Sequence, residues 1–176
     1  MKKRILIITI LLHALLIVTV YVFQGVILPF MRLNGLVPLL LPVASTGIAL
    51  YEGRYTGGIA GLFAGILCDI SFNHPVGVFT VFLTLSGLVV GTLADTVILR
   101  GFVTYYICCS AVLIVSAIVQ MFPLVVSPLY SIPIQSLLSI AIQQTIYSLI
   151  FALPIWFFVQ SLGRWTERMS PSGRTY

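Results

Sequence analysis

The sequence predicts an all-α, polytopic integral membrane protein with six transmembrane helices and both termini in the cytoplasm. Nine Lys and Arg with four Asp and Glu make only 7% of the 176 residues charged, against about 25% in an ordinary soluble domain. Hydrophobic residues make up 60% of the chain, and the mean hydropathy is +1.15. The uncharged intervals reach the roughly 20 residues that a membrane-spanning helix needs. This composition excludes a soluble enzyme, a disordered chain and a secreted disulfide scaffold.

The uncharged intervals give one transmembrane domain, residues 1–163, followed by a short basic cytoplasmic tail, residues 164–176. The first interval follows Lys2-Lys3-Arg4 and is too long for a signal peptide, so we expect an uncleaved helix. Prolines are expected to break the outer half of the second span and to divide the last long interval in two. The predicted spans are residues 5–31, 33–51, 55–73, 76–99, 101–122 and 135–162.

The distribution of Lys and Arg predicts the orientation, because cytoplasmic loops collect positive charge. With both termini inside, eight of the nine cations face the cytoplasm and only Arg32 lies outside. The net charge of +5 is therefore an orientation signal, and the scattered cations offer no basic face for nucleic acid. Aromatic residues are expected in a belt at the inner headgroups: Tyr51, Tyr55, Tyr105, Tyr106 and Trp165.

Glycine recurs every four residues in the predicted third span, at Gly53, Gly57, Gly61 and Gly65, and again in the fourth, at Gly87 and Gly91. Such a face without side chains allows two helix backbones to approach closely. The sequence leaves two roles open: packing against a neighbouring helix of the same chain, or binding another protein. Residues 61–69 and 87–95 both read G-L-x-x-G-x-L-x-D, either by chance or because two antiparallel helices present matching faces.

Two carboxylates fall inside predicted spans, where ionisable groups are candidates for function. Asp69 and Asp95 are expected at opposite membrane faces, so they cannot form a general acid–base pair. Asp95 is expected to pair with Arg100. Asp69 is interpreted either as a solvated helix-end residue that orders the turn at 73–75, or as a functional carboxylate.

His13 is the only ionisable residue well inside the first span. We expect a neutral histidine bonded to a neighbouring helix rather than a proton relay, because no second titratable group is predicted at its depth. Glu52 and Arg54 are expected to form a solvated ion pair. Interhelical hydrogen bonds are expected from a polar patch in the last span: Gln143, Gln144, Thr145 and Ser148.

The sequence contains no motif of a known class of enzyme and no spacing of His, Cys, Asp and Glu that would ligate a metal. Its three cysteines, Cys68, Cys108 and Cys109, lie in apolar stretches and are interpreted as small packing residues. We therefore expect neither catalysis nor a cofactor.

The pattern from Pro38 to Asp95 resembles the MreD family of bacterial rod shape-determining membrane proteins. The resemblance rests on Pro38, on the stretch G-x-x-x-G-G-x-x-G-x-x-x-G-x-L-x-D of residues 53–69, and on Gly77 before the next helix. It implies a non-catalytic scaffold of the cell-elongation machinery in the bacterial cytoplasmic membrane. The implied partners are MreC by direct contact, MreB, RodA and a class B penicillin-binding protein in the wider complex, and membrane lipid. In this interpretation the glycine face and a pocket near Asp69 hold a helix of MreC.

The chain also resembles the substrate-binding S-components of energy-coupling-factor vitamin transporters, whose helical bundle is compatible with the same six spans. Those proteins carry a line of alanines on their first helix, whereas residues 5–31 contain only Ala14. The predicted outer surface offers few groups that would grip a vitamin. Vitamin binding is therefore the alternative function and shape determination the preferred one.

Overall fold

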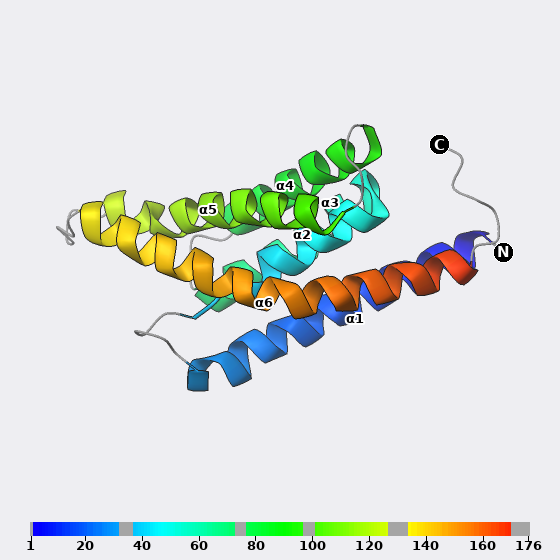
Figure 1. Cartoon of the computed structure of the whole chain (residues 1–176), viewed down its shortest axis with the longest axis horizontal. Helices are drawn as coiled ribbons and strands as arrows, with labels where there is room; N and C mark the ends of the chain where they lie inside the picture. The colour runs from blue at the N-terminus through cyan, green and yellow to red at the C-terminus, as the bar shows by residue number, and fades with distance from the viewer. Residues whose placement is uncertain (1, 32–36, 73–76, 97–100, 127–133, 170–176) are drawn as a thin grey trace.

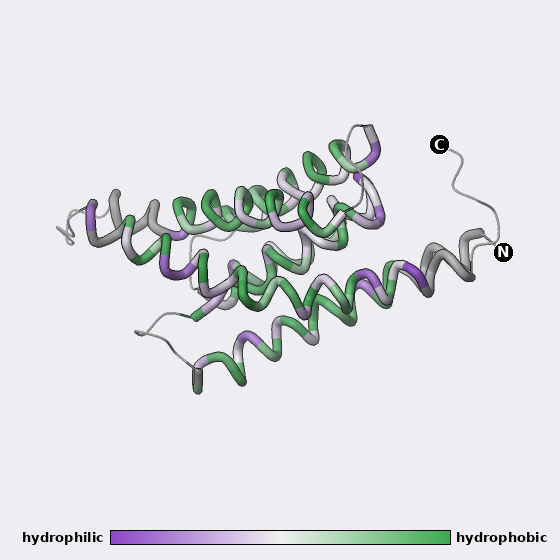
Figure 2. The backbone as a smooth tube through the Cα atoms, in the orientation of Figure 1, coloured by the Kyte–Doolittle hydropathy of each residue, from purple (hydrophilic) through white to green (hydrophobic). Residues whose placement is uncertain are grey.

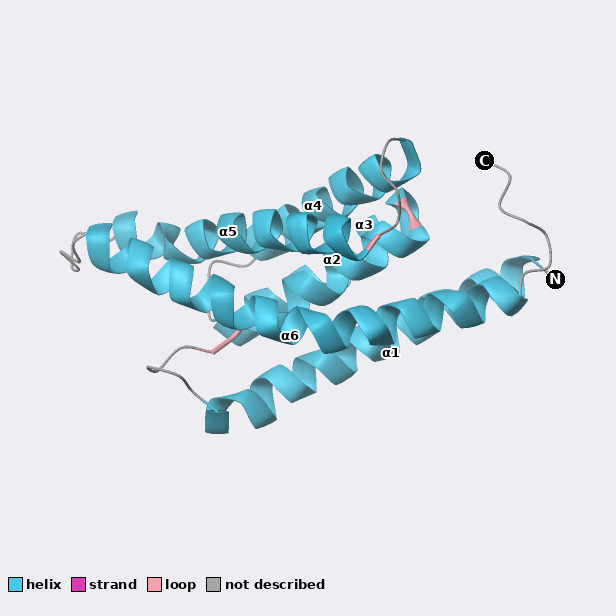
Figure 3. Ribbon diagram, in the orientation of Figure 1, coloured by secondary structure: helices cyan, strands magenta, loops and turns pink. Residues whose placement is uncertain are grey.

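The computed structural model describes residues 2–31, 37–72, 77–96, 101–126 and 134–169 (Figures 1 and 3). Within these ranges all regular structure is helical, which confirms the predicted all-α class. The α-helices are α1 (Lys2–Val22), α2 (Leu40–Glu52), α3 (Arg54–Phe72), α4 (Val78–Thr96), α5 (Phe102–Val126) and α6 (Ile134–Met169).

Four helical stretches in the described residues are long and apolar enough to cross a membrane, namely Thr9–Phe30, Val78–Thr96, Phe102–Gln120 and Leu138–Arg164. Apolar residues predominate along these stretches, with single polar residues between them (Figure 2). The other two helices differ from them in ways that the sequence explains. α2 has only 13 residues, and α3 carries Arg54, Asp69 and four glycines.

α2 forms the centre of the bundle, and every residue from Leu40 to Leu50 is buried. The other five α-helices all pack against it. The helix begins later than the predicted start at residue 33, because the residue before it, Leu39, is extended. Pro38 accounts for part of this, since a proline disfavours helical backbone in the residue before it. Pro42 is tolerated because it lies in the first turn of α2, where its missing N–H leaves no helical bond unmade.

α3 and α4 form an antiparallel pair, the most extensive helix contact in the bundle. α5 and α6 form a second pair, and α1 packs against α2 and α3 and lies close to α6 only toward the end of the bundle where the chain begins (Figure 1). α5 continues through Pro123 to Val126, past its predicted end at residue 122. α6 continues to Met169, so the first six residues of the predicted tail are helical.

The aromatic residues near the start of α5 form a buried cluster with rings of α2 and α6. The prediction of an aromatic belt at the inner headgroups is therefore wrong for Tyr105. Tyr105 is fully buried, and its ring centroid lies 4.7 Å from that of Trp156 on α6. Tyr51 of α2 meets the same indole edge-on at 6.3 Å. Tyr55 is largely exposed, as a belt residue would be. The large rings fill the space between α2, α5 and α6.

Candidate functional site

The glycine rows of α3 and α4 face each other and form a seam, defined here as Gly57, Gly61, Gly65, Gly87 and Gly91. A Cβ atom at Gly61 would overlap the backbone carbonyl of Leu83, and one at Gly87 would overlap the carbonyl of Gly57. The two backbones are therefore in direct contact along the seam. Of the two roles that the sequence left open for the glycine face of α3, the structure shows packing within the chain. α4 therefore covers the face on which the MreC helix was expected to bind.

Asp69 receives the first backbone N–H groups of α4. Its carboxylate accepts hydrogen bonds from the N–H groups of Gly77 (2.9 Å), Phe79 (3.0 Å) and Thr80 (3.1 Å), and from the Thr80 hydroxyl (2.6 Å). An anionic acceptor at a helix N-terminus satisfies donors that have no partner within the helix and complements the helix dipole. Asp69 thus holds the chain that leads into α4, but it is only 5% exposed, so the expectation of a solvated residue is wrong.

Asp95 performs the reciprocal task at the other end of the pair. Its carboxylate accepts a hydrogen bond of 3.2 Å from the backbone N–H of Arg54, the first residue of α3. Gly53 lies against this carboxylate with φ of +88°, and a Cβ atom there would be 2.8 Å from Oδ1. Each aspartate of the repeated G-L-x-x-G-x-L-x-D pattern therefore contacts the start of the other helix. The expected partner Arg100 lies outside the described residues.

A buried histidine–glutamate contact joins α1 to the end of α2. His13 Nε2 lies 3.8 Å from Glu52 Oε1, and both side chains are only 3% exposed. His13 Nδ1 lies 2.7 Å from the carbonyl oxygen of Thr9 in its own helix. The prediction that no titratable group lies at the depth of His13 is therefore wrong. The expectation that Glu52 is solvated is also wrong, since its side chain is buried. The Arg54 guanidinium lies over the ring of Tyr55, 4.5 Å from its centroid.

The start of α2 is held by side chains of α6 and of the turn that follows α1. Gln24 Oε1 accepts hydrogen bonds from the N–H groups of Leu40 (2.9 Å) and Leu41 (3.2 Å). Ser148 accepts one from Leu39, and Gln144 donates one to the carbonyl of Val37. In apolar surroundings such partners are required wherever a helix is interrupted.

The side chains of the predicted polar patch of α6 make two kinds of hydrogen bond, some to the segment that leads into α2 and some within α6. Gln144 and Ser148 bond across helices, whereas Gln143 and Thr145 bond within α6. Gln24 belongs to no motif of the sequence, although its position in an apolar span indicates that it needs a partner. Gln24 lies in a π-helical turn, Phe23–Ile27, that follows α1.

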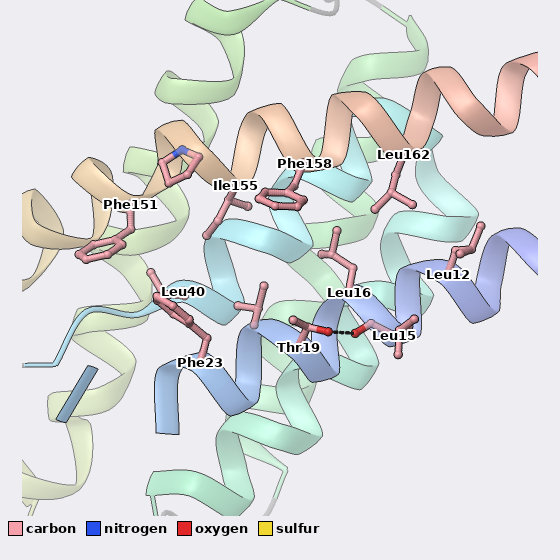
Figure 4. Close-up of a pocket in the computed structure, with 12 residues that line it drawn as sticks. Leu12, Leu15, Leu16, Thr19, Phe23, Leu40, Phe151, Ile155, Phe158 and Leu162 are labelled. Carbon is pink, nitrogen blue, oxygen red and sulfur yellow. Dashed lines mark hydrogen bonds between the residues drawn. The ribbon is translucent and has the colours of Figure 1, made fainter. Parts of the chain in front are cut away.

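A groove of about 500 Å³ lies between α1 and α6, and the sequence analysis did not predict it. We call it the α1–α6 groove (Figure 4). Its lining is apolar except for Thr19, whose hydroxyl donates to the carbonyl of Leu15 in its own helix. The remaining lining residues are Leu12, Leu15, Leu16, Val20, Phe23, Leu40, Phe151, Pro154, Ile155, Phe158 and Leu162.

Within the described ranges, no three His, Cys, Asp or Glu side chains gather as a metal would require. The three cysteines are free thiols, and Cys68 and Cys109 are buried packing residues. No protein-family model, no curated protein and no solved structure matches the chain. In the part of the chain that the structure describes, the fold is an apolar helical bundle with four helical stretches long and apolar enough to cross a membrane. Several of its buried polar groups join one part of the bundle to another.

Proposed function

We propose that the protein is a non-catalytic membrane scaffold of the bacterial cell-elongation machinery. It binds MreC and helps to position peptidoglycan synthases, so that the cell keeps its rod shape. The observation that carries the proposal is where the resemblance to MreD falls. The residues from Pro38 to Asp95 that resemble the family are those that form α2 and the α3–α4 seam, the rigid centre of the molecule.

The proposal places the chain in the bacterial cytoplasmic membrane with six spans and both termini inside. The start of α1 and the end of α6 lie at the same end of the bundle (Figure 1), which supports this placement. Both ends are rich in Lys and Arg, as cytoplasmic ends are. Arg54 and Asp69 lie near opposite ends of α3, so that helix keeps an uncharged interior.

The way in which the polar side chains are used supports a scaffold. Asp69, Asp95, Gln24 and Ser148 each accept a backbone hydrogen bond from another helix or from the chain leading into it. Their hydrogen-bonding capacity therefore serves to hold the helices in one arrangement. A fixed arrangement of this kind is what a protein needs to position a partner.

In this proposal MreC contacts the outward face of α3, because α4 already covers the glycine face. The outward residues lie at helical spacing on one side of α3, and each is at least 40% exposed. Without a hydrophobic driving force in lipid, a partner helix would bind such a face by close packing. The face consists of Ile59, Leu62, Phe63, Ile66 and Ile70.

Co-purification of MreC with the tagged protein tests this contact. Ile70→Trp on α3 is compared with Ile118→Trp on α5, since the two isoleucines are 66% and 63% exposed. We expect Ile70→Trp to reduce captured MreC about fivefold, the effect of losing about 1 kcal/mol of helix packing, and Ile118→Trp to leave it unchanged. Equal capture by both variants, at equal membrane levels, would remove the α3 face from the proposal.

Depletion of the protein in its source cell tests the function itself. We expect rounding and loss of control over cell width. Vitamin auxotrophy in cells of normal shape would contradict the proposal and favour the S-component alternative.

A further inference from the structure

We infer that the α1–α6 groove binds one acyl chain of an anionic glycerophospholipid, with the lipid phosphate at the basic end of α1 and α6. The inference rests on the proposed membrane placement and orientation and is independent of the proposed partner MreC. Four observations carry it: the lining, the size, the two attachments to α2 and the charge at one end.

The lining favours a hydrocarbon ligand. Eleven of the twelve lining residues are apolar, and the hydroxyl of the twelfth, Thr19, is already used within α1. The groove therefore contains no free polar group that would orient a sugar, a peptide or a vitamin. Burial of apolar surface is the only source of affinity that the lining provides.

The size of the groove accommodates a single acyl chain. An apolar cavity of about 150 Å³ holds one benzene, so 500 Å³ has room for on the order of 20 carbons. The lining from Leu12 to Phe23 covers roughly 16 Å of helix. The groove therefore has the volume and the length for one chain of a membrane lipid.

The attachments of α1 and of the turn that follows it explain why the groove exists. Near the start of the lining His13 contacts Glu52 of α2, and at its end Gln24 bonds the start of α2. α1 is thus tied to α2 near one end of the groove, and the π-helical turn that follows α1 is tied to α2 at the other end, toward which α1 and α6 separate (Figure 1). The space is set by the His13–Glu52 contact and by the backbone N–H groups of Leu40 and Leu41, and not by the apolar side chains of the lining.

The charges at the ends of α1 and α6 favour an anionic lipid headgroup. Leu12 and Leu162 lie at the same end of the groove, and Arg164 follows two residues after Leu162 (Figure 4). Positions 2–4 and 164–169, at the ends of the two helices, hold five cations and one acidic residue, Glu167. At the opposite end the lining consists of the uncharged residues Phe23, Leu40 and Phe151 (Figure 4). Basic clusters at the cytoplasmic ends of transmembrane helices bind anionic headgroups.

The chain-binding part is tested by native mass spectrometry of the purified full-length protein in mild detergent. The probes are phosphatidylglycerol and phosphatidylcholine with identical 18-carbon chains. Leu15→Trp fills the groove, and Leu11→Trp is its matched control, because both leucines lie on α1 and both are 62% exposed but only Leu15 lines the groove. We expect one retained phosphatidylglycerol on the parent protein and on Leu11→Trp, and at least tenfold weaker retention on Leu15→Trp.

The headgroup part is tested with Arg164→Gln, for which Arg54→Gln is the control, a second exposed cation outside the groove. We expect Arg164→Gln to reduce the preference for phosphatidylglycerol over phosphatidylcholine about fivefold, and Arg54→Gln to leave that preference unchanged. A parent protein with no preference between the two lipids would overturn the choice of headgroup.

Equal loss of lipid in Leu11→Trp and Leu15→Trp would overturn the groove as the binding site. So would loss of MreC, without loss of lipid, in Leu15→Trp, since the groove would then belong to the protein partner. Lipid retention is measured on purified protein, whereas the scaffold function is measured by cell shape. A failure of the lipid-binding inference would therefore not contradict the scaffold function, and the reverse also holds.

Discussion

At the scale of single residues, Asp69 is the group of the α3–α4 pair whose burial costs the most hydration free energy, because it is a carboxylate. A buried carboxylate is tolerated only when hydrogen bonds compensate for the loss of water. Asp69 has four donors from Gly77, Phe79 and Thr80, so its charge is matched by the dipoles of the first turn of α4. This geometry assigns Asp69 a structural role at the helix junction.

We predict that Asp69→Ala lowers the free energy of unfolding by about 3 kcal/mol, because it leaves buried N–H groups without an acceptor. The measurement is thermal unfolding of the purified protein in detergent. Asp69→Asn keeps one acceptor oxygen and should fall between the parent and Asp69→Ala. Ser71→Ala is the control, since the Ser71 hydroxyl bonds only within α3, to Leu67. An Asp69→Ala variant as stable as Ser71→Ala would contradict the capping role.

The residue types were readable from the sequence, but their partners were not. The sequence placed Asp69, Asp95, His13 and Gln24 in apolar stretches, where each needs a partner. Which partner each obtains depends on how the helices are staggered. Glu52 reaches His13 because α2 ends at that level, and no periodicity within the first span encodes this.

At the scale of elements, the glycine spacing was the most informative part of the sequence. It predicted a close contact of helix backbones, within the chain or with another protein, and matching faces of two antiparallel helices were one of two explanations left open for the repeated pattern. The structure adds the reason for the aspartates in the repeat, since each contacts the first residues of the opposite helix. The α1–α6 groove was not predictable in this way, because it results from the divergence of two helices rather than from a motif in either.

We predict that Gly61→Ala prevents normal packing of α3 on α4, because the added Cβ would overlap the Leu83 carbonyl, a backbone atom that cannot move independently. The expected cost is above about 3 kcal/mol, the scale of severe overpacking, and is visible as a reduced level in the membrane. Gly25→Ala is the matched control, since a Cβ atom at Gly25 meets no atom within 4 Å. Equal membrane levels of the two variants would refute the seam.

At the scale of the whole molecule, α2 is the axis around which the bundle is built. It is short and fully enclosed, and its backbone start is held by α6 and by the turn that follows α1 rather than by its own sequence. α3 and α4 form a rigid pair on one side, and α1 and the turn that follows it stand at the periphery, each with one attachment to α2. The hydropathy of the chain predicted the helices, and the prolines predicted an interruption in the outer half of the second span, but neither predicted that this short helix would be enclosed by all the others.

The proposed orientation predicts which positions react with a reagent that cannot cross the membrane. In a variant with the three natural cysteines replaced, Ser131→Cys should react with an impermeant maleimide in intact cells. Ser170→Cys should react only after the membrane is opened. The positive-charge asymmetry places residue 131 outside and residue 170 inside. The reverse pattern would invert the topology and move the basic end of the α1–α6 groove to the outer leaflet.

The reciprocal contacts of Asp69 and Asp95 also bear on how the chain enters the bilayer during synthesis. α4 is among the helical stretches long and apolar enough to cross a membrane, whereas α3 carries Arg54, Asp69 and four glycines. α3 gains its packing surface, and a matched environment for Asp69, only when α4 is beside it. We therefore expect the two helices to enter the bilayer together as one hairpin, because each aspartate obtains its backbone donors from the other helix or the chain leading into it.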